Sequence, residues 1–333
     1  MSFRASDWIL LAPELVLTSA GLLLMVLGIS IGKAKEEFLG FLAVLSVVAT
    51  GIALALAAVQ PGRGSAPILG GMFILDNFAL FFKLLILLSL ALTVLASVRF
   101  VGSSPYAGGE YYALVLFAGV GMLFMVSGTN LASIYIALEL MALSSYVLAG
   151  YFKGEPKSTE AALKYFILGA FSSGVLLYGI SLVYGLTGKL GLTDIAGRFA
   201  SAERSNLTIL GILLILAGLL FKVAAVPFHV WAPDVYEGAP TPVTAFFSAA
   251  PKVAAVALFV RVAIDAFPTI VPQWQQITVF LSIASMGLGA FAAIGQRNIK
   301  RLMAYSSIGH VGYALIGLSA ATPAGVQGVL VYM

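Results

Sequence analysis

The sequence contains no cysteine, and charged residues are scarce in it. Without thiolates the chain cannot hold an iron–sulfur cluster, form a disulfide or carry out thiol chemistry. Only 10% of its 333 residues are Asp, Glu, Lys or Arg, and the net charge of +4 is spread thinly over the predicted loops. Such a distribution forms no basic patch, so we expect no nucleic-acid partner.

Hydrophobic residues are correspondingly abundant, at 61% of the sequence, and the mean hydropathy is +1.05. A water-soluble domain of this size could not bury so much apolar surface, so most of the chain must face membrane lipid. A helix of about 20 apolar residues crosses the roughly 30 Å of bilayer hydrocarbon. Runs of this kind predict an all-α polytopic membrane protein. The predicted spans lie near 8–31, 38–59, 78–98, 110–128, 131–151, 159–185, 207–232, 241–263, 275–296 and 301–320, and an eleventh run begins near Pro323.

Lys and Arg residues in the loops give the orientation of such a bundle, because they gather on the cytoplasmic side. The bias in this sequence is modest and favours an N-terminus outside the cytoplasm. The first predicted span is too long for a signal peptide and lacks a small-residue cleavage site, so we expect a mature helix there. The residues after odd-numbered spans are Lys33, Lys35, Arg99, Lys153, Lys157, Arg297, Lys300 and Arg301, and those on the opposite side are Arg4, Arg63, Lys189, Arg198 and Arg204.

Short connections predict one packed transmembrane domain over residues 1–333. Two extramembrane stretches are longer than the others. Residues 60–77 are rich in Gly and Pro and are expected to be irregular. Residues 187–206 are expected to include a short surface helix that starts at Thr193 or Asp194, because an acid favours a helix N-terminus.

The fifth and tenth predicted spans resemble each other weakly. Both begin with Asn and an apolar residue, at Asn130 and Asn298, and both have serines near the centre. Transporters are often built from internal repeats, many of them inverted. An offset of five spans implies inverted topology. The organisation this predicts is N-terminal helices over 1–109, a first repeat over 110–263, and the start of a second, incomplete repeat over 275–333.

Charged side chains inside spans cost about 2.5–3.5 kcal/mol each at mid-depth, and five of them are conspicuous in the predicted spans. A long lysine stem can reach interfacial water, which suits Lys83 and Lys164. That explanation fits Lys222 and Lys252 poorly, since apolar turns flank both. It fails for Glu139, whose short side chain lies near the middle of its span. An acid and several bases buried in one bundle suggest pairing in a wet interior, as in proton or ion paths.

Pro227 follows Lys222 by five residues and predicts a break in the seventh span. Proline cannot donate to the carbonyl of Val223, and its ring forces that turn apart. A membrane tolerates such a break only where the freed carbonyls meet protein or water. Burial favours the neutral amine of Lys222, whereas a half-helix C-terminus and a nearby acid favour the ammonium. This balance is what a switchable proton carrier requires.

The chain has only two histidines, His229 and His310. His229 lies about two turns beyond Lys222, on the far side of the predicted break, and is a candidate proton relay. A lone histidine in a helix is more often a structural residue, and His310 has no predicted role. Pro251 precedes Lys252 directly, so the turn before Lys252 is expected to be disturbed.

The stretch from Lys222 to Arg261, "KVAAVPFHVWAPDVYEGAPTPVTAFFSAAPKVAAVALFVR", closely resembles the seventh and eighth spans of the antiporter-like subunits of respiratory complex I. It is more similar to the N type of NADH–quinone oxidoreductase subunit than to the L and M types. "ELMALSSYVLAGY" from Glu139, "STEAALKYFILGAFSSGVLLYGISLVYG" around Lys164 and "NIKRLMAYSSIGHVGYALIGL" around His310 are similar to the same subunits. The resemblance covers nearly the whole chain.

This resemblance implies fourteen core helices, inverted repeats of five, and breaks in helices seven and twelve. By the same resemblance Glu139 is the acid of span five and Lys222 the proton-carrying lysine of the broken helix. Lys252 matches the central lysine of span eight, and Lys164 an additional lysine of span six. The present sequence stops in span eleven, so it is expected to be truncated at its C-terminal end.

The resemblance also implies a function and partners. The chain would be a proton-translocating membrane subunit of NADH–quinone oxidoreductase, a translocase in the inner membrane of a bacterium. It would bind no cofactor, while NADH, FMN, iron–sulfur clusters and quinone would bind to other subunits. Its partners would be membrane lipid, the antiporter-like L and M subunits and the small K, J and A subunits. Two alternatives stay open, a multisubunit cation/proton antiporter and a related membrane-bound hydrogenase or dehydrogenase, and the buried Glu and Lys residues disfavour a purely structural scaffold.

Overall fold

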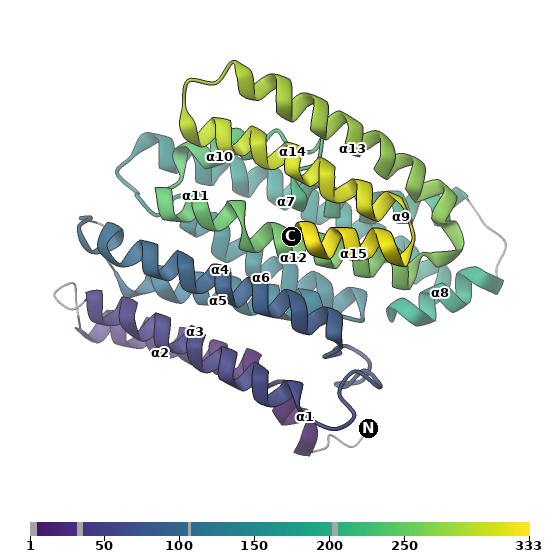
Figure 1. Cartoon of the computed structure of the whole chain (residues 1–333), viewed down its shortest axis with the longest axis horizontal. Coiled ribbons are helices and arrows are strands. Elements are labelled where there is room, and N and C mark those ends of the chain that lie inside the picture. The colour runs from purple at the N-terminus through teal and green to yellow at the C-terminus, as the bar shows by residue number, and fades with distance from the viewer. Residues whose placement is uncertain (1–4, 32–35, 106–107, 202–205) are drawn as a thin grey trace. The chain divides into compact units, whose positions relative to one another are not determined.

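The computed structural model describes residues 5–31, 36–105, 108–201 and 206–333, and these ranges are almost entirely helical (Figure 1). The fold divides into two compact units, whose boundaries fall inside the helices α7, α10 and α12. The first unit comprises Met1–Leu163 and Gly238–Ala254, and the second comprises Lys164–Glu237 and Ala255–Met333. Four basic residues that entered the orientation prediction, Arg4, Lys33, Lys35 and Arg204, lie outside the described residues.

The first unit is built mainly from the N-terminal helices. In it, α2 and α4 each pack against both α3 and α5, and α5 packs along α6. The helix α11 lies against α4 and α6. The elements of this unit are α1 (Ala5–Leu10), α2 (Ala12–Ile31), α3 (Glu36–Ala58), α4 (Asn77–Gly102), α5 (Gly109–Ser127), α6 (Leu131–Ala149), the first turns of α7 (Pro156–Thr187), α11 (Thr241–Ser248) and the start of α12 (Ala250–Arg261).

The loop between α3 and α4 is irregular, as its composition predicts. Glycines with positive φ, such as Gly62 and Gly64, supply conformations that other residues rarely adopt. The loop is nevertheless fixed to the helices, since the N–H of Ile74 donates to the carbonyl of Ser127 at 2.9 Å. Phe73 forms isolated bridges to Ile68 and Gly128 and lies buried.

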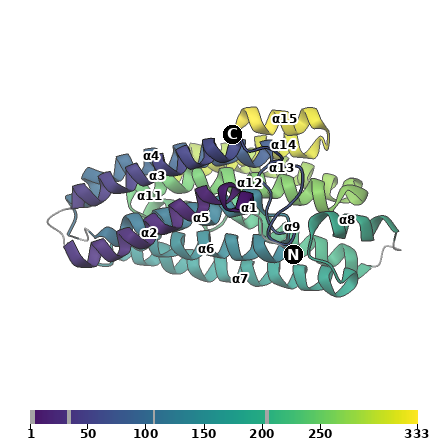
Figure 2. The ribbon, with the colours of Figure 1, turned by 90° about the horizontal axis from the view of Figure 1, so that it is seen from below.

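The second unit contains the C-terminal helices. Its helices α13 and α14 run side by side (Figure 1), and α15 packs on α14 (Figure 2). The surface helix expected from Thr193 or Asp194 is α8, with Asp194 in its first turn. The remaining elements are the rest of α7, α8 (Leu192–Ser201), α9 (Asn206–Val223), α10 (Ala232–Gly238), the rest of α12, a π-helical turn η2 (Val262–Ala266), a 3-10 turn η3 (Pro268–Ile270), α13 (Val271–Ile294), α14 (Ile299–Ser319) and α15 (Pro323–Tyr332).

Within the second unit, glycines bring α7 and α9 close together. A Cβ atom on Gly179 of α7 would lie 2.7 Å from the backbone nitrogen of Ile215 on α9. One on Gly218 of α9 would lie 2.6 Å from the Cβ of Leu176. Small residues of this kind allow close backbone approach between membrane helices. They set the separation at which a side chain on α7 can reach Lys222 on α9.

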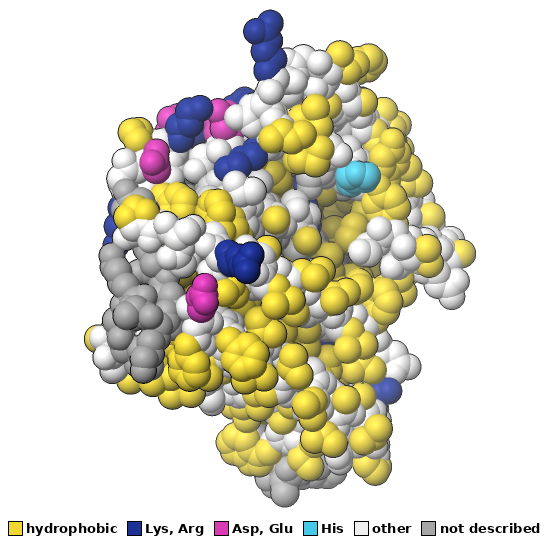
Figure 3. Space-filling view, turned by 60° about the vertical axis from the view of Figure 1, so that its left-hand side comes forward, with side chains coloured by type: hydrophobic (Ala, Val, Ile, Leu, Met, Phe, Trp, Pro, Cys, Tyr) yellow, Lys and Arg dark blue, Asp and Glu magenta, His cyan; other side chains and the backbone are white. Residues whose placement is uncertain are grey.

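Nine helical segments in the described ranges are long and apolar enough to cross a membrane. They correspond to the first nine spans predicted from the sequence, and the predicted fold class is confirmed. The tenth predicted span, 301–320, is the 21-residue helix α14. It is not among the nine segments, and it begins with polar and charged residues such as Lys300 and Arg301. On the face drawn in Figure 3, hydrophobic side chains cover much of the surface, and charged side chains gather mainly toward its upper left, as a protein that crosses lipid requires.

The two asparagines that begin the fifth and tenth predicted spans have the same local role. The side chain of Asn130 accepts a hydrogen bond from the N–H of Ala132 and caps α6. The side chain of Asn298 accepts from the N–H of Lys300 and caps α14. The likeness seen in sequence therefore includes a shared N-cap.

Candidate functional site

Lys222 lies in the last turn of α9, immediately before the break in the seventh span. Only 7% of this residue is exposed. Its Nζ donates a hydrogen bond to the hydroxyl of Ser173 on α7 at 3.4 Å and lies 5.9 Å from the ring centre of Phe221. The amine is thus enclosed, with a hydroxyl and an aromatic face among its contacts.

The break itself lies where Pro227 predicts it. The helix α9 ends at Val223, the peptide bond between Val226 and Pro227 is cis, and helix resumes only at Ala232. The N–H of Val226 donates to the hydroxyl of Ser285 on α13 at 2.9 Å. A backbone donor that left the helical pattern has therefore found a buried side-chain partner, as a membrane requires.

Trp231 closes the break from its distal side. Its indole N–H donates to the carbonyl of Phe221 at 3.0 Å. The indole also stacks on the ring of Tyr165, with ring centres 4.5 Å apart and planes inclined by 7°. The expectation that backbone groups at the break meet protein partners is confirmed for the carbonyl next to Lys222.

His229 lies in the non-helical segment between α9 and α10 and is half-buried. Its Nδ1 is buried and has no hydrogen-bond partner among the described residues. Its carbonyl accepts from the N–H of Ala232 at 2.9 Å, which starts the next helix. A ring nitrogen in this condition has capacity for one further hydrogen bond.

Lys164 belongs to an ion-pair network that the sequence did not reveal. Its Nζ lies 2.6 Å from Oδ2 of Asp234 on α10, and Nη1 of Arg301 lies 2.6 Å from the other oxygen of the same carboxylate. Arg301 also contacts Glu237 at 3.1 Å. The lysine side chain is 41% exposed, so its position fits the snorkelling interpretation, with a carboxylate as partner.

Asp234 lies outside the spanning segments, between those that end at Val223 and begin at Thr241. Burial raises the pKa of its carboxyl, but hydrogen bonds from Lys164 and Arg301 together outweigh burial and lower this pKa below the usual value. Asp234 is therefore ionised at neutral pH. The sequence contains it in the stretch "PDVYEG", but an acid just beyond a predicted span resembles an ordinary interfacial residue.

Glu139 lies near the middle of α6, in the first unit. Its Oε1 is buried and makes no hydrogen bond to any described residue. A buried carboxylate oxygen without a partner costs about 1–3 kcal/mol or more.

Lys252 also lies in the first unit and is 6% exposed. The eighth span is interrupted before it, where Ala249 separates α11 from α12 with φ −116° and ψ −85°. The expected disturbance beside Pro251 is thus present. This span is the most enclosed of the nine, with 83% of its apolar window buried, which excludes snorkelling for Lys252.

A buried ion pair in the first unit also escaped the sequence analysis. Nζ of Lys83 on α4 lies 2.5 Å from Oε1 of Glu14 on α2, and both side chains are 0% exposed. The same Nζ lies 4.6 Å from the ring centre of Phe73. Snorkelling is therefore wrong for Lys83. Oε2 of Glu14 is buried without a hydrogen-bond partner among the described residues.

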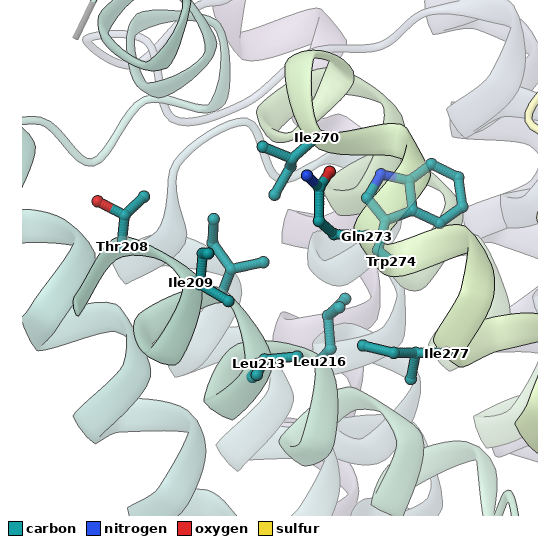
Figure 4. Close-up of a pocket in the computed structure, with 9 residues that line it drawn as sticks. Thr208, Ile209, Leu213, Leu216, Ile270, Gln273, Trp274 and Ile277 are labelled. Carbon is teal, nitrogen blue, oxygen red and sulfur yellow. The ribbon is translucent and has the colours of Figure 1, made fainter. Parts of the chain in front are cut away.

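The structure thus groups three of the five predicted site residues. Lys164, Lys222 and His229 belong to the second unit, in and around the broken span. Glu139 on α6 and Lys252 on α12 belong to the first unit. The pocket between α9 and α13 is a different feature, because Ile212, Leu216, Trp274 and Ile277 line it and none of its lining residues is ionisable (Figure 4).

These observations define a polytopic helical membrane protein in which a broken span carries an enclosed lysine at its break. Residues 128–333 match the family described as "NADH:quinone oxidoreductase/Mrp antiporter, TM". The chain belongs to this family.

Within this family, the chain is most usefully compared with curated subunits of the N type. The chain is 51% identical over 321 residues to NADH-quinone oxidoreductase subunit N 1 of Rhizobium meliloti, and 52% identical over 328 residues to subunit N of Rhodospirillum rubrum. Each alignment covers 96% of this chain and 66% of the relative. The resemblance to N-type subunits is confirmed, and the chain spans about two thirds of the length of these relatives.

Solved structures show the same fold. A chain of respiratory complex I from Thermus thermophilus is 34% identical with a TM-score of 0.76, over 96% of this chain and 68% of that one. A chain of an archaeal membrane-bound sulfane sulfur reductase is 27% identical with a TM-score of 0.82, over 98% and 67%. A chain of the Mrp complex from Dietzia is 22% identical with a TM-score of 0.79, over 99% and 62%, and shows likeness of fold alone.

Proposed function

We propose that the chain is a proton-translocating membrane subunit of NADH–quinone oxidoreductase. Its similarity to N-type subunits supports this assignment, since the relatives carry that name at about half identity over 96% of the chain. NADH, FMN, iron–sulfur clusters and quinone then belong to other subunits. The partners are membrane lipid, the L and M subunits and the small K, J and A subunits.

The enclosed position of Lys222 at a helix break is the observation that carries the proposal. On an unbroken helix that faces lipid, a lysine amine is costly unless its side chain extends to the membrane interface. Here a hydroxyl, an aromatic ring and a rearranged backbone surround it instead. Movement of an acid toward or away from this amine shifts the balance between ammonium and neutral amine, which loads and unloads a proton.

We further propose Glu139, Lys252 and His229 as proton-transfer groups of the same subunit. Among the described residues, Oε1 of Glu139 and Nδ1 of His229 make no hydrogen bond, and the amine of Lys252 is enclosed. Each is a site where gain or loss of one proton is coupled to a change of partner. The inverted repeat over 110–263 and 275–333 would relate two such paths in the whole subunit.

Substitution of the lysines by arginine tests the mechanism. A guanidinium keeps the positive charge but cannot release its proton under cellular conditions, since its pKa exceeds 12. We expect Lys222→Arg and Lys252→Arg to abolish ΔpH formation as severely as Lys→Ala. Reconstituted complex is assayed for ΔpH, with subunit content as the assembly check and NADH oxidation by an artificial acceptor as the control. Recovery of ΔpH by arginine at both positions would mean that the lysines serve only as fixed charges.

For localisation, we propose the inner membrane of a bacterium with the N-terminus on the periplasmic side. Cysteine labelling tests this orientation. Because the chain has no cysteine of its own, a single introduced thiol shows on which side of the membrane its position lies. A membrane-impermeant maleimide applied to intact spheroplasts should label Ser65→Cys and spare Glu155→Cys. The reverse labelling pattern refutes the orientation.

A cation/proton antiporter of the Mrp type is the second candidate, favoured by the shared fold. Co-purification separates the two. NADH-oxidising and iron–sulfur subunits accompany the chain under the first proposal, whereas an antiporter would purify without them.

A further inference from the structure

The helix α10 follows the break at the end of the seventh span, and it has only seven residues. A helix of this length is not stable alone in water or at a membrane surface, because nucleation is unfavourable and few hydrogen bonds form. Contacts with other elements must therefore hold it. Those contacts decide the geometry of the break, since α10 is connected to Lys222 by the eight non-helical residues 224–231.

One carboxylate on α10 joins it to two long helices. Asp234 contacts Lys164 in the third turn of α7 through Oδ2, and Arg301 in the first turn of α14 through Oδ1, at 2.6 Å each. Glu237, one turn further along, adds a second contact to Arg301 at 3.1 Å. All four side chains are 21–41% exposed. Ion pairs exposed to this degree stabilise a fold only weakly, so their main effect is on position.

A continuous set of contacts leads from this network to Lys222. Tyr165 follows Lys164 on α7 and stacks on Trp231. Trp231 in turn donates to the carbonyl of Phe221, the residue before Lys222. Lys164 and Tyr165 thus hold the two ends of one short segment, Lys164 through Asp234 and Tyr165 through Trp231.

We infer that Asp234 is a positioning residue for proton transfer at Lys222, and that Lys164 is its fixed cationic partner and not a proton carrier. The carboxylate holds α10 between α7 and α14, and the Trp231–Tyr165 stack transmits that placement to the backbone beside Lys222. This inference rests on the proposed function for its activity readout. The geometric part stands on contacts within the second unit alone.

Four variants of the assembled complex test the inference. Asp234→Asn and Lys164→Met remove the pair, and each is expected to lower the rate of ΔpH formation by about five- to tenfold. The double variant should lose no more than either single variant, because both remove one interaction. Lys164→Arg keeps the pair and is expected to retain at least half of the rate. Asp194→Asn, the same change on the exposed helix α8, is the matched control and should leave the rate unchanged.

A thiol-protection assay reads the geometry without activity. The chain has no cysteine, so Ala225→Cys places a single thiol in the break, where the alanine is 0% exposed. We expect maleimide to label it at least fivefold faster when Asp234→Asn is added. Ala314→Cys, buried at 2% exposure on α14, should keep its labelling rate in both backgrounds and so reports global loosening.

Two results overturn the inference. One is loss of ΔpH in Lys164→Arg as complete as in Lys222→Arg, which would make Lys164 a proton carrier. The other is unchanged labelling of Ala225→Cys in Asp234→Asn. If the unsubstituted complex forms no ΔpH at all, the proposed function fails, and the labelling assay still decides whether Asp234 positions the break.

Discussion

Glu139 is an acid inside a spanning helix, and its surroundings differ from those of the exposed acids. Its Oε1 is buried on α6 without a hydrogen-bond partner among the described residues. An exposed acid in this chain is not in this position. The two kinds of carboxylate should therefore respond differently to the same neutral substitution.

We predict that Glu139→Gln lowers the rate of ΔpH formation by about tenfold or more, because a positioned proton-transfer group contributes at least that much. NADH oxidation with an artificial acceptor should continue, since it does not need this chain. Glu160→Gln, an exposed acid on α7, is the control. Full ΔpH in an assembled Glu139→Gln complex would assign Glu139 a structural role.

The pH dependence of the Asp234 network follows from the sign of its shift. Burial raises the pKa of Asp234, and hydrogen bonds from Lys164 and Arg301 bring it below the usual value. A lowered folded-state pKa means that the stabilisation is fully present above the unfolded value of about 4 and is lost as pH falls through the folded value. The deficit of Asp234→Asn in ΔpH formation should thus be equal at pH 6 and pH 8. A deficit that disappears at pH 6 would show that Asp234 titrates in that range.

Some functional residues can be predicted from the sequence more easily than others. Lys222, Lys252 and Glu139 stand out because a charge in an apolar run has a known cost. Glu14 and Asp234 do not, since both lie near the ends of predicted spans, where acids are common. Their partners are 67 to 70 residues away in the chain. Pairings at that separation depend on helix packing, which hydropathy does not encode.

At the scale of elements, the broken span was predictable in position but not in extent. Pro227 lacks a backbone N–H donor, and its ring distorts the preceding helical turn. The position of the break can therefore be predicted from the sequence. Helix nevertheless resumes only at Ala232. The unwound length depends on two tertiary partners, Ser285 for the N–H of Val226 and Trp231 for the carbonyl of Phe221.

We predict that Ser285→Ala lowers ΔpH formation severalfold, because the part-buried N–H of Val226 loses its acceptor at a cost of about 1 kcal/mol or more. Ser282, one turn earlier on α13, is the matched control. It is equally buried, but its hydroxyl donates to the carbonyl of Gly312 on α14. Ser282→Ala should cost a similar amount of stability and spare ΔpH formation. Equal loss of ΔpH formation in both variants would show that the hydrogen bond at the break has no specific role in proton transfer.

At the scale of the whole molecule, hydropathy located nine spans because lipid exposure leaves a long apolar run. It did not locate ion pairs inside the fold. The Glu14–Lys83 pair joins α2 and α4, which each pack on α3 and α5. Its effect on assembly can be separated from any effect on proton transfer.

We predict that Glu14→Gln alone or Lys83→Met alone lowers the amount of assembled complex, since one buried charge left unpaired costs about 3–5 kcal/mol. The double variant Glu14→Leu/Lys83→Met should restore assembly, because apolar residues of similar volume replace a buried pair at little or no cost. Subunit content and thermal denaturation of the purified complex are the measurements. An assembled double variant that fails to form ΔpH would show that this pair takes part in proton transfer.

The same buried pair has a consequence for biosynthesis. Glu14 enters the membrane with the first span, and its partner follows 69 residues later in the third. At about 5–20 residues per second, the ribosome takes roughly 3–14 s to deliver Lys83. During that interval the acid lacks its lysine partner and must be shielded in another way, since hydrocarbon offers it no counterion. The first two spans are therefore inserted before the Glu14–Lys83 ion pair can form. The pair forms, and joins the first span to the third, only after the third span has been inserted.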